Sequence, residues 1–243
     1  MVDNVFCVNG SCCQRHVGED IIGCMKARRL HSRQVSIDEA KEIQRALASQ
    51  VVCQSSLRPP SLIAGVDISG EDGYGMAKAA VVVLRYPGLE IVERKVITMP
   101  VVFPYVPGLL SFREVPLILA ACEQLTVTPD LFIADGQGMA HPRRLGLACH
   151  LGLFLDVPTI GCAKSILCGR HDEVGGERGD SAPLYDGGEV VGAAVRTRRG
   201  VKPVYVSIGH RVDLRTAVDW VLACCYRYRL PEPTRLAHLA AMG

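Results

Sequence analysis

An apolar run that ends in an acid constrains the fold more than any other feature of this sequence. Residues 131–134 are all apolar, Asp135 follows at once, and Gly136 and Gly138 precede His141, two arginines and a helical pattern. A buried strand that turns into a helix is typical of α/β proteins, which bind ligands beyond the carboxyl ends of their strands. The glycines allow close approach of a ligand, and the helix N-terminus favours an anion. Asp135 could instead only cap the helix, but His141 and the arginines favour a binding site.

Length and charge narrow the class of protein. A chain of 243 residues can bury a full core, as one large domain or as one domain with an appendage. The formal net charge of +2 gives no global attraction to polyanions, so nucleic-acid binding would need a local basic surface. We find no apolar run long enough to cross a bilayer and no pattern of a signal peptide. We therefore expect a cytoplasmic protein without a membrane partner.

The cysteines indicate a reducing compartment. There are eleven, an odd number, and several fall in apparent core elements, which is typical of buried thiols in a cytosolic protein. Four of them lie close together with His16 near the N-terminus, but their spacing matches no paired zinc motif, so we assign no zinc site. These four are Cys7, Cys12, Cys13 and Cys24. We treat residues 1–33 as a cysteine-containing N-terminal extension and residues 34–243 as a single domain.

A helix and three strands are expected upstream of Asp135. A capping box at Ser36 and apolar residues at helical spacing predict an amphipathic helix to about Val52. Three strand-like runs with short turns between them come next, at residues 62–69, 77–86 and 90–99. This arrangement is typical of an antiparallel meander.

Two acids and one aromatic residue in this first half could serve chemistry. Asp67 lies inside the first strand, where a lone carboxylate either binds a cation or faces solvent from an edge. Alternation places it on one face with Ile63 and favours burial. Tyr105 is held on an extended loop by prolines, and it either acts as a wedge or packs over the core. Glu114 follows Ser111 by three residues, a capping-box spacing, so by itself Glu114 is better explained as a helix cap.

The second half is expected to continue the sheet. A helix at residues 144–155 and a strand at residues 158–161 follow the central stretch, and another short element begins at Ala163. If the strands are parallel, as a helical crossover requires, Lys164 lies at the same sheet edge as Asp135. A solvated side chain is the default interpretation of a lysine.

The last part of the chain predicts a hairpin, a further strand and two helices. The hairpin pairs residues 182–185 with 189–196, the strand covers residues 203–208, and the longer helix runs over residues 213–228. The last short helix carries His238. Basic residues gather between the hairpin and the next strand, where they form a solvated turn or contact phosphates. They are Arg196, Arg198, Arg199 and Lys202.

Five motifs occur together in a fixed order. Along the chain they are Asp67 in a first strand, the Tyr105 loop followed by Glu114, the stretch from Asp135 to His141, Lys164 after Ala163, and the segment that ends in His238. Their combination closely resembles endonuclease V, a family of deoxyinosine-specific repair nucleases, over roughly residues 34–243. The resemblance implies an α/β, ribonuclease-H-like mixed sheet, in which an antiparallel three-strand meander is continued by parallel strands with helices on both faces. Asp67 and Asp135 would lie on adjacent central strands.

The resemblance implies a hydrolase that depends on Mg²⁺, for which Mn²⁺ can substitute. Attack by water on a phosphodiester builds negative charge, and carboxylate-bound Mg²⁺ offsets this charge and activates the water. Asp67, Glu114 and Asp135 are the implied metal ligands, which replaces the cap interpretation of Glu114. Lys164 would orient water or neutralise the scissile phosphate, and His238 would ligate a metal or contact the phosphate. The implied cut is at the second phosphodiester 3′ to deoxyinosine, leaving a 3′-hydroxyl and a 5′-phosphate.

The lesion is expected to be recognised by extrusion of the base from the stack, with Tyr105 as the wedge that fills the gap. A close-fitting backbone pocket can exclude the exocyclic amine of guanine. The implied pocket residues are Gly108, Leu109, Leu110, Gly136 and Gly138, with His141 beside them. We expect a monomer that acts on inosine-containing DNA. One alternative is an endoribonuclease that prefers inosine in single-stranded RNA, and another is a binding module without activity, against which the three acids argue.

Overall fold

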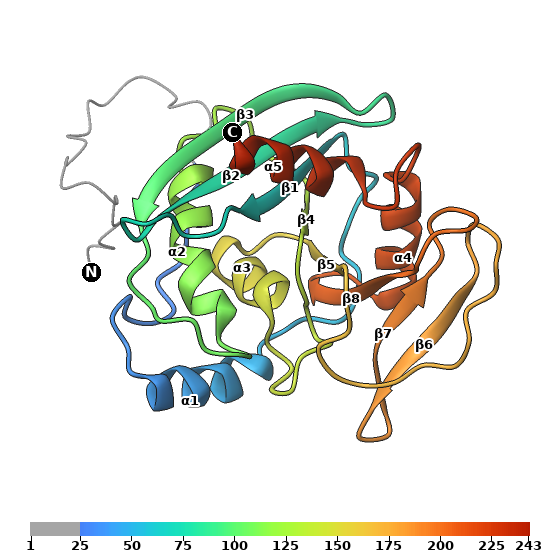
Figure 1. Cartoon of the computed structure of the whole chain (residues 1–243), viewed down its shortest axis with the longest axis horizontal. Coiled ribbons are helices and arrows are strands. Elements are labelled where there is room, and N and C mark those ends of the chain that lie inside the picture. Colours follow the sequence, from blue (N-terminus) through green and yellow to red (C-terminus); the bar gives the residue numbers. More distant parts are fainter. Residues whose placement is uncertain (1–24) are drawn as a thin grey trace.

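One mixed sheet of eight strands organises the computed structural model, which describes residues 25–243 (Figure 1). The strands are β1 (Leu62–Ile68), β2 (Met76–Arg85), β3 (Glu90–Pro100), β4 (Leu131–Ala134), β5 (Thr159–Ala163), β6 (Ser181–Asp186), β7 (Glu189–Val195) and β8 (Val204–His210). The helices are α1 (Ile37–Ala48), α2 (Leu110–Cys122), α3 (Leu147–Leu155), α4 (Leu214–Ala223) and α5 (Glu232–Met242). Across the sheet the order is β3-β2-β1-β4-β5-β8-β7-β6.

The directions of the strands confirm the predicted fold class. β1, β2 and β3 form the antiparallel meander, and β4 and β5 extend it in parallel from β1. β8, β7 and β6 then add an antiparallel half, because β8 pairs antiparallel with β5 and the predicted hairpin of β6 and β7 follows it. β1 and β4 are neighbours, so Asp67 and Asp135 lie on adjacent positions of the sheet as predicted.

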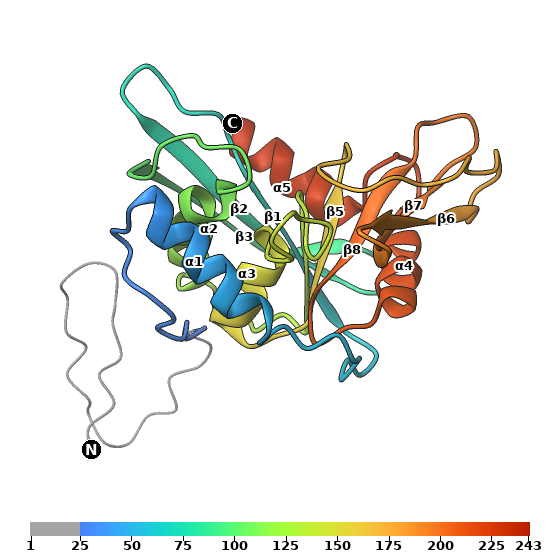
Figure 2. The same ribbon diagram turned by 90° about the horizontal axis from the view of Figure 1, so that it is seen from below.

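Helices cover both faces of the sheet, with α1, α2 and α3 on one side and α4 and α5 on the other (Figure 2). Alternation along β1 divides its side chains between the two faces. Ala64 and Val66 pack with α2 and α3, whereas Ile63 packs with the core beneath α4. Asp67 therefore shares the α4 and α5 face with Ile63, and Asp135 shares it with Ile133 of β4.

Helix α5 lies almost directly on the backbone of β1. A Cβ atom added to Gly65 would come within 1.9 Å of the Pro233 carbonyl oxygen, so only glycine permits this approach. The first turn of α5 is consequently anchored on the strand that carries Asp67. This close contact brings a later residue of α5, His238, to the end of that strand.

The two predicted capping boxes had different outcomes. Ser36 and Glu39 form the predicted capping box of α1, although this helix ends at Ala48 rather than near Val52. The capping box predicted at Ser111 was wrong, because the N-cap of α2 is Leu109, two residues earlier, and no side chain caps the helix. Ser111 is buried inside the helix, with its Oγ atom 3.0 Å from Nδ1 of His150 in α3. A tertiary partner thus replaces the expected local one.

Loops replace parts of three other predicted elements. Helix α3 begins at Leu147 instead of residue 144, because Arg144 takes a left-handed backbone conformation. Helix α4 ends at Ala223, and residues 224–231 connect it to α5. No new element begins at Ala163, since β5 ends there and the following Lys164 is exposed.

Residues 25–33 pack on the same body as the predicted domain. Met25 and Leu30 contact the core beneath α2 and α3, and the His31 ring lies against Phe112, His150 and Phe154. The cluster of Cys7, Cys12, Cys13, Cys24 and His16 lies outside the described residues. The seven cysteines that are described are free thiols, as expected for a reducing compartment. Across residues 25–243, the helices are too short or too polar to span a membrane.

Candidate active site

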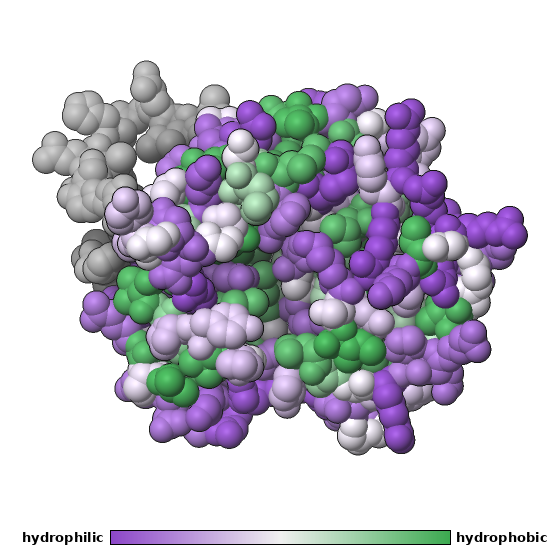
Figure 3. Space-filling view, viewed as in Figure 1, coloured by the Kyte–Doolittle hydropathy of each residue, from purple (hydrophilic) through white to green (hydrophobic). Residues whose placement is uncertain are grey.

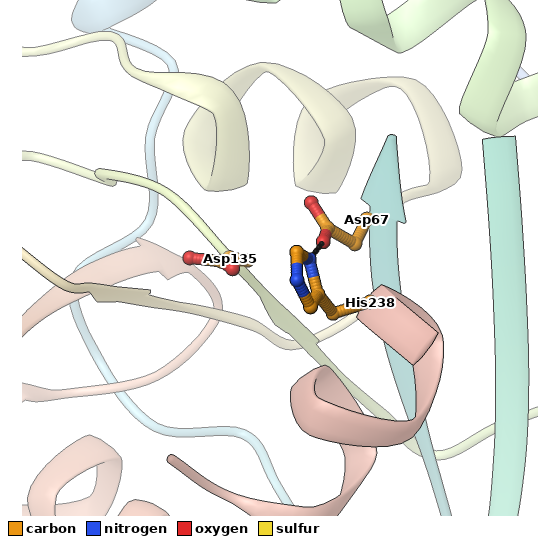
Figure 4. A group of neighbouring side chains, drawn as sticks. All are labelled: Asp67, Asp135 and His238. Atoms are coloured by element: carbon orange, nitrogen blue, oxygen red, sulfur yellow. Dashed lines mark hydrogen bonds and ion pairs between the residues drawn. The ribbon is translucent and has the colours of Figure 1, made fainter. Parts of the chain in front are cut away.

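Two carboxylates and one imidazole converge where β1 and β4 end (Figure 4). Asp67 comes from β1, Asp135 directly follows β4, and His238 reaches over from α5. One potential ligand atom from each residue lies within 4.8 Å of those of the other two. The shared sheet face explains the two acids, and the contact of α5 with Gly65 explains the histidine.

Each acid of this group has a cationic or hydrogen-bonding partner. Nδ1 of His238 lies 2.7 Å from Oδ2 of Asp67, so Nδ1–H donates to the carboxylate and Nε2 is left for a further partner. Nζ of Lys164 lies 2.5 Å from Oδ2 of Asp135, at the sheet edge predicted for it. The pKa of Asp67 is raised, first by burial and then by the charge of Asp135, while the bond from His238 opposes the rise.

Glu114 lies in the first turn of α2, outside the group of three with ligand atoms within 4.8 Å. It is nevertheless coupled to that group, because burial, and then the charges of Asp67 and Asp135, raise its pKa to about 8. Glu114 lines a cleft of about 320 Å³ together with Tyr105. The three acids implied by the sequence therefore act on one another electrostatically, while His238, rather than Glu114, is the third residue of the compact group.

The donor set suits a hard divalent cation. Carboxylate oxygens are the preferred protein ligands of Mg²⁺ and Mn²⁺, and an imidazole nitrogen also accepts transition metals. Asp67 and Asp135 keep only 14% and 10% of their side-chain surface exposed, so water does little to separate their charges. Burial, and after it the repulsion of neighbouring carboxylates, raises the pKa values of Asp67 and Glu114, and a bound cation would relieve the repulsion.

Tyr105 stands on the loop that leads into α2. Its side chain is 72% exposed, so it does not pack over the core, which was one of the two interpretations of its sequence context. Leu110, the first residue of α2, is also exposed and lines the same cleft as Tyr105 and Glu114. An aromatic and an aliphatic side chain therefore border the cleft beside a buried acid.

The carbonyl oxygen of Gly108 holds this loop in place by accepting three hydrogen bonds. Its donors are Nε2 of His141 at 2.9 Å, Nη2 of Arg143 at 2.7 Å and Nε2 of Gln44 at 3.1 Å. Gly108 has a φ of +77°, and a Cβ atom added to it would lie 2.9 Å from Nη2 of Arg143. The turn thus requires glycine. We call the group of Gln44, Gly108, His141 and Arg143 the Gly108 cradle.

Both ring nitrogens of His141 make hydrogen bonds within this cradle. Nε2 donates to Gly108, and Nδ1 accepts from the backbone N–H of Arg143 at 3.1 Å. Only 3% of the residue is exposed, and burial lowers its pKa to about 4, so the ring is neutral. His141 therefore supports the pocket loop from behind.

The other residues predicted for the pocket lie at different depths. Gly108 and Gly136 are partly exposed, whereas Leu109 and Gly138 are buried. The N–H of Gly138 donates to Oγ of Ser207 at 2.8 Å, and a side chain at Gly138 would collide with the carbonyl of Ile208. The buried glycine therefore fixes the backbone under the site.

Gln44 was not identified from the sequence. It is fully buried in α1, donates to the carbonyls of Gly108 and Leu145, and accepts from Nε of Arg143. The sequence did contain a sign of its role, because Gln44 is a polar residue on the buried face of α1, together with Ala40 and Leu47. Its partners lie far along the chain, however, and helical periodicity does not identify them.

Two further residues place Lys164. The side-chain amide of Gln137 donates to the carbonyl of Ser165 at 2.8 Å, which ties the loop after β4 to the loop after β5. Nη2 of Arg229 donates to the carbonyl of Lys164 itself at 2.7 Å. The lysine backbone is therefore held from both sides while its side chain reaches Asp135.

A mixed sheet of this order, with acids at the ends of neighbouring strands and a lysine beside them, places the protein in the ribonuclease-H-like fold class. The family model described as Endonuclease V matches residues 45–239. The chain belongs to the endonuclease V family.

Curated relatives match most of the chain. Endonuclease V of Gloeobacter violaceus is 56% identical over 212 residues, which cover 86% of each protein. Endonuclease V of Rippkaea orientalis is 49% identical over 213 residues, or 88% of this chain and 93% of that protein. The similarity therefore extends over nearly the full length of these relatives.

Solved structures show the same fold. Endonuclease V of Streptomyces avermitilis is 43% identical with a TM-score of 0.83, covering 87% of this chain and 93% of that one. Endonuclease V of Ciona intestinalis, in complex with a 24mer DNA containing an inosine followed by a ribo-adenosine, is 27% identical with a TM-score of 0.72. That match covers 85% of this chain and 95% of the Ciona chain.

Proposed function

We propose that this protein is a DNA repair endonuclease that cuts a strand on the 3′ side of deoxyinosine by hydrolysis that depends on a divalent cation. The observation that carries the proposal is the convergence of Asp67, Asp135 and His238 beside Lys164. Membership of the endonuclease V family and the inosine-containing DNA bound by the Ciona relative support the choice of substrate. The cut falls at the second phosphodiester from the lesion and leaves a 3′-hydroxyl and a 5′-phosphate.

Asp67 and Asp135 are the residues that would hold Mg²⁺ or, in its place, Mn²⁺, with Glu114 completing the acidic set from α2. Bound Mg²⁺ supplies an activated water and offsets the charge of the phosphoryl oxygens. The raised pKa values of Asp67 and Glu114 support this assignment, because burial and then the charges of the neighbouring carboxylates disfavour their ionised forms, which a cation would stabilise. The assignment predicts competition between protons and cations at these groups.

Lys164 and His238 act on the phosphate and the water. The ammonium of Lys164, held against Asp135, brings one positive charge to the side of the acids where the phosphate lies. Nδ1–H of His238 is used by Asp67, so its Nε2 is the atom available to ligate the metal or to contact the phosphate. Both side chains are partly exposed and can reach a bound strand.

Recognition rests on Tyr105 and the loop behind it. Tyr105 enters the stack where the inosine base leaves it, and the base is received along the backbone of Gly108, Leu110 and Gly136. Leu109, Gly138 and His141 support this backbone from beneath. Because the loop is held rigidly, it can exclude the exocyclic amine of guanine sterically.

An endoribonuclease that prefers inosine in single-stranded RNA is the second candidate. The DNA in the Ciona complex carries a ribo-adenosine directly after its inosine, which favours tests with ribose at that place. Only the surroundings of the 2′-hydroxyl distinguish the two substrates. We also infer that the enzyme works as a monomer, since one chain supplies every residue named above, and in the cytoplasm, where free thiols such as those of the seven described cysteines persist.

The deciding experiment is a nicking assay on matched strands. Inosine-containing DNA and RNA, and the same strands with guanine in place of hypoxanthine, are incubated with the protein in Mg²⁺ and in EDTA. We expect cutting of inosine-containing DNA only, at the second 3′ phosphodiester, and only with Mg²⁺. Faster cutting of the RNA would select the second candidate. Binding to inosine strands without cutting in any divalent cation would overturn both.

A further inference from the structure

The connection between α4 and α5 lies against the turn between β7 and β8 and forms an exposed shelf next to Lys164 (Figure 1). We define the strand ledge as the five side chains that this shelf presents. They are Arg198, Lys202, Tyr226, Arg227 and Tyr228. None of them has a place in the site described above.

Hydrogen bonds hold the strand ledge in a fixed position. Nη1 of Arg198 donates to the carbonyl of Arg227 at 3.0 Å, and Oγ1 of Thr197 donates to the carbonyl of Arg229 at 2.7 Å. The guanidinium of Arg229 donates to the carbonyls of Lys202, Pro203 and Lys164. One arginine therefore connects both halves of the ledge to the lysine beside Asp135.

The two tyrosines present ring surface to solvent. Tyr226 is 79% exposed and Tyr228 is 49% exposed. The guanidinium of Arg235 lies over the Tyr228 ring, 4.2 Å from its centroid, and Arg235 is itself fixed by Glu232 at 2.6 Å. One face of Tyr228 is thus backed by a cation, which leaves the other as a firm platform. Exposed, supported aromatic rings are the usual stacking sites for unpaired bases.

The cations of the ledge are not neutralised. Among residues 25–243, no acidic side chain forms an ion pair with Arg198, Lys202 or Arg227, whereas the neighbouring Arg199 pairs with Glu177. At the end of the molecule that contains α4 and β7, hydrophilic side chains alternate with hydrophobic ones (Figure 3). Unpaired cations interleaved with exposed tyrosines favour a polyanion that also carries flat rings.

The layout of the sheet indicates the order in which a bound strand would meet the pocket loop, the acids and the ledge. Tyr105 and Gly108 belong to the α1 and α2 side of the sheet, where the lesion is received. Asp135 and Lys164 follow β4 and β5, and His238 and the ledge belong to the α4 and α5 side. A strand that passes from Tyr105 over the acids therefore reaches Lys164 next and the ledge after it.

We propose that the strand ledge binds the single-stranded segment on the 3′ side of the cut, with unpaired bases stacked on Tyr226 and Tyr228 and phosphates held by Arg198, Lys202 and Arg227. The direction rests on the proposed function, because cutting 3′ to the lesion places that segment beyond the acids. The ledge makes affinity depend on the downstream flank, and it holds the cut product after hydrolysis.

The test combines the loss of the tyrosines with shortening of the strand. Affinity for a fluorescent inosine-containing DNA strand is measured by anisotropy in EDTA, for the wild type and for the double variant Tyr226→Ala, Tyr228→Ala. The flank beyond the cut, or the flank on the 5′ side of the lesion, is shortened from about ten to about two nucleotides. Tyr185→Ala serves as the matched control, because this half-exposed tyrosine lies at the opposite end of the β6–β7 hairpin.

We expect the double variant to bind the long strand about a hundredfold more weakly, or about tenfold for each stacked base. Shortening the 3′ flank should weaken the wild type by a similar factor and the variant hardly at all. The variant Arg198→Gln, Lys202→Gln should lower the salt slope of binding by about 1.4. Unchanged affinity in the tyrosine variant, or a loss that follows the 5′ flank, overturns the proposal.

The outcome is separable from that of the proposed function. If the wild type fails to cut inosine strands but its affinity still depends on the tyrosines and the 3′ flank, the nuclease proposal fails and the ledge stands. If cutting is normal and binding ignores the tyrosines, only the ledge fails. Loss of binding to duplex alone, with single strands unaffected, also counts against it.

Discussion

The Gly108 cradle lies between α1 and the start of α2, and the acid group lies where β1 and β4 end, and the two groups differ in how their buried polar atoms are satisfied. In the cradle, three donors share the carbonyl of Gly108, and burial keeps His141 neutral with both nitrogens bonded. In the acid group, Asp67 and Glu114 have raised pKa values partly because other carboxylates are near. The cradle is complete without a ligand, whereas we expect a cation to complete the acid group.

The largest expected effect comes from removing one acid. Asp135→Ala should lower Mg²⁺-dependent nicking of inosine-containing DNA by about a thousandfold or more, because several kcal/mol of charge stabilisation is lost. Thermal unfolding in EDTA should shift little or upward, since the variant relieves repulsion on Asp67. Asp219→Ala, at an exposed position of α4, is the control. Full activity of Asp135→Ala would refute the metal assignment.

The second-largest expected effect is a loss of unfolding free energy. Gln44→Leu leaves the Leu145 carbonyl and Nε of Arg143 without their partner, which should cost about 3 kcal/mol of unfolding free energy. Denaturant titration measures the loss, and the exposed Gln50→Leu provides the baseline. Discrimination between inosine and guanine should fall with it, while cation affinity stays unchanged. A variant as stable as the wild type would show that the hydrogen bonds of Gln44 do not stabilise the cradle.

The third-largest expected effect is a dependence of Mg²⁺ stabilisation on pH. The folded pKa of Glu114, about 8, lies above its ordinary value of 4.5, so its contribution to stability is full below about pH 4.5 and is lost as the pH rises through 8. Mg²⁺ should restore the lost part by replacing the proton. We therefore expect Mg²⁺ to raise the Tm by about 4 °C more at about pH 8.5 than at about pH 5.5.

Scanning fluorimetry at both pH values measures this difference. In Glu114→Gln the extra rise should disappear, because the side chain no longer titrates. An equal Mg²⁺ shift at the two pH values in the wild type would mean that Glu114 does not sense the cation.

The smallest effect separates recognition from cation binding. Tyr105→Ala should weaken binding of inosine-containing DNA by about tenfold, the contribution of one stacked ring. Its cation affinity, followed by the Mg²⁺-induced rise in Tm, should not change. Tyr74→Ala, which removes another highly exposed tyrosine, is the control. A Tyr105 variant with full preference for inosine over guanine would exclude the wedge.

Local pattern predicted the sheet and placed the aspartates on it. The alternation of β1 and the apolar run of β4 are properties of consecutive residues, so Asp67, Asp135 and Lys164 could be placed at one sheet edge. The start of α2 could not be predicted in the same way, because Ser111 makes its hydrogen bond to His150 of α3 instead of capping its own helix.

Long-range contacts account for the remaining differences. Gln44 is one polar residue in an amphipathic helix, and its partners lie about a hundred residues away. Residues 25–33 showed no periodicity, yet His31 and Met25 pack against α2 and α3. The nearness of His238 to Asp67 depends on how α5 crosses β1, which no local pattern encodes.

The seating of α5 on the bare backbone of Gly65 has a consequence for synthesis of the protein. Asp67, Asp135 and Lys164 are translated well before α5, but the imidazole beside Asp67 arrives only with that helix. A chain still on the ribosome therefore exposes the uncovered glycine and lacks His238. A nascent chain therefore cannot bring His238 together with Asp67 and Asp135 around a nearby RNA or DNA strand until α5 has emerged.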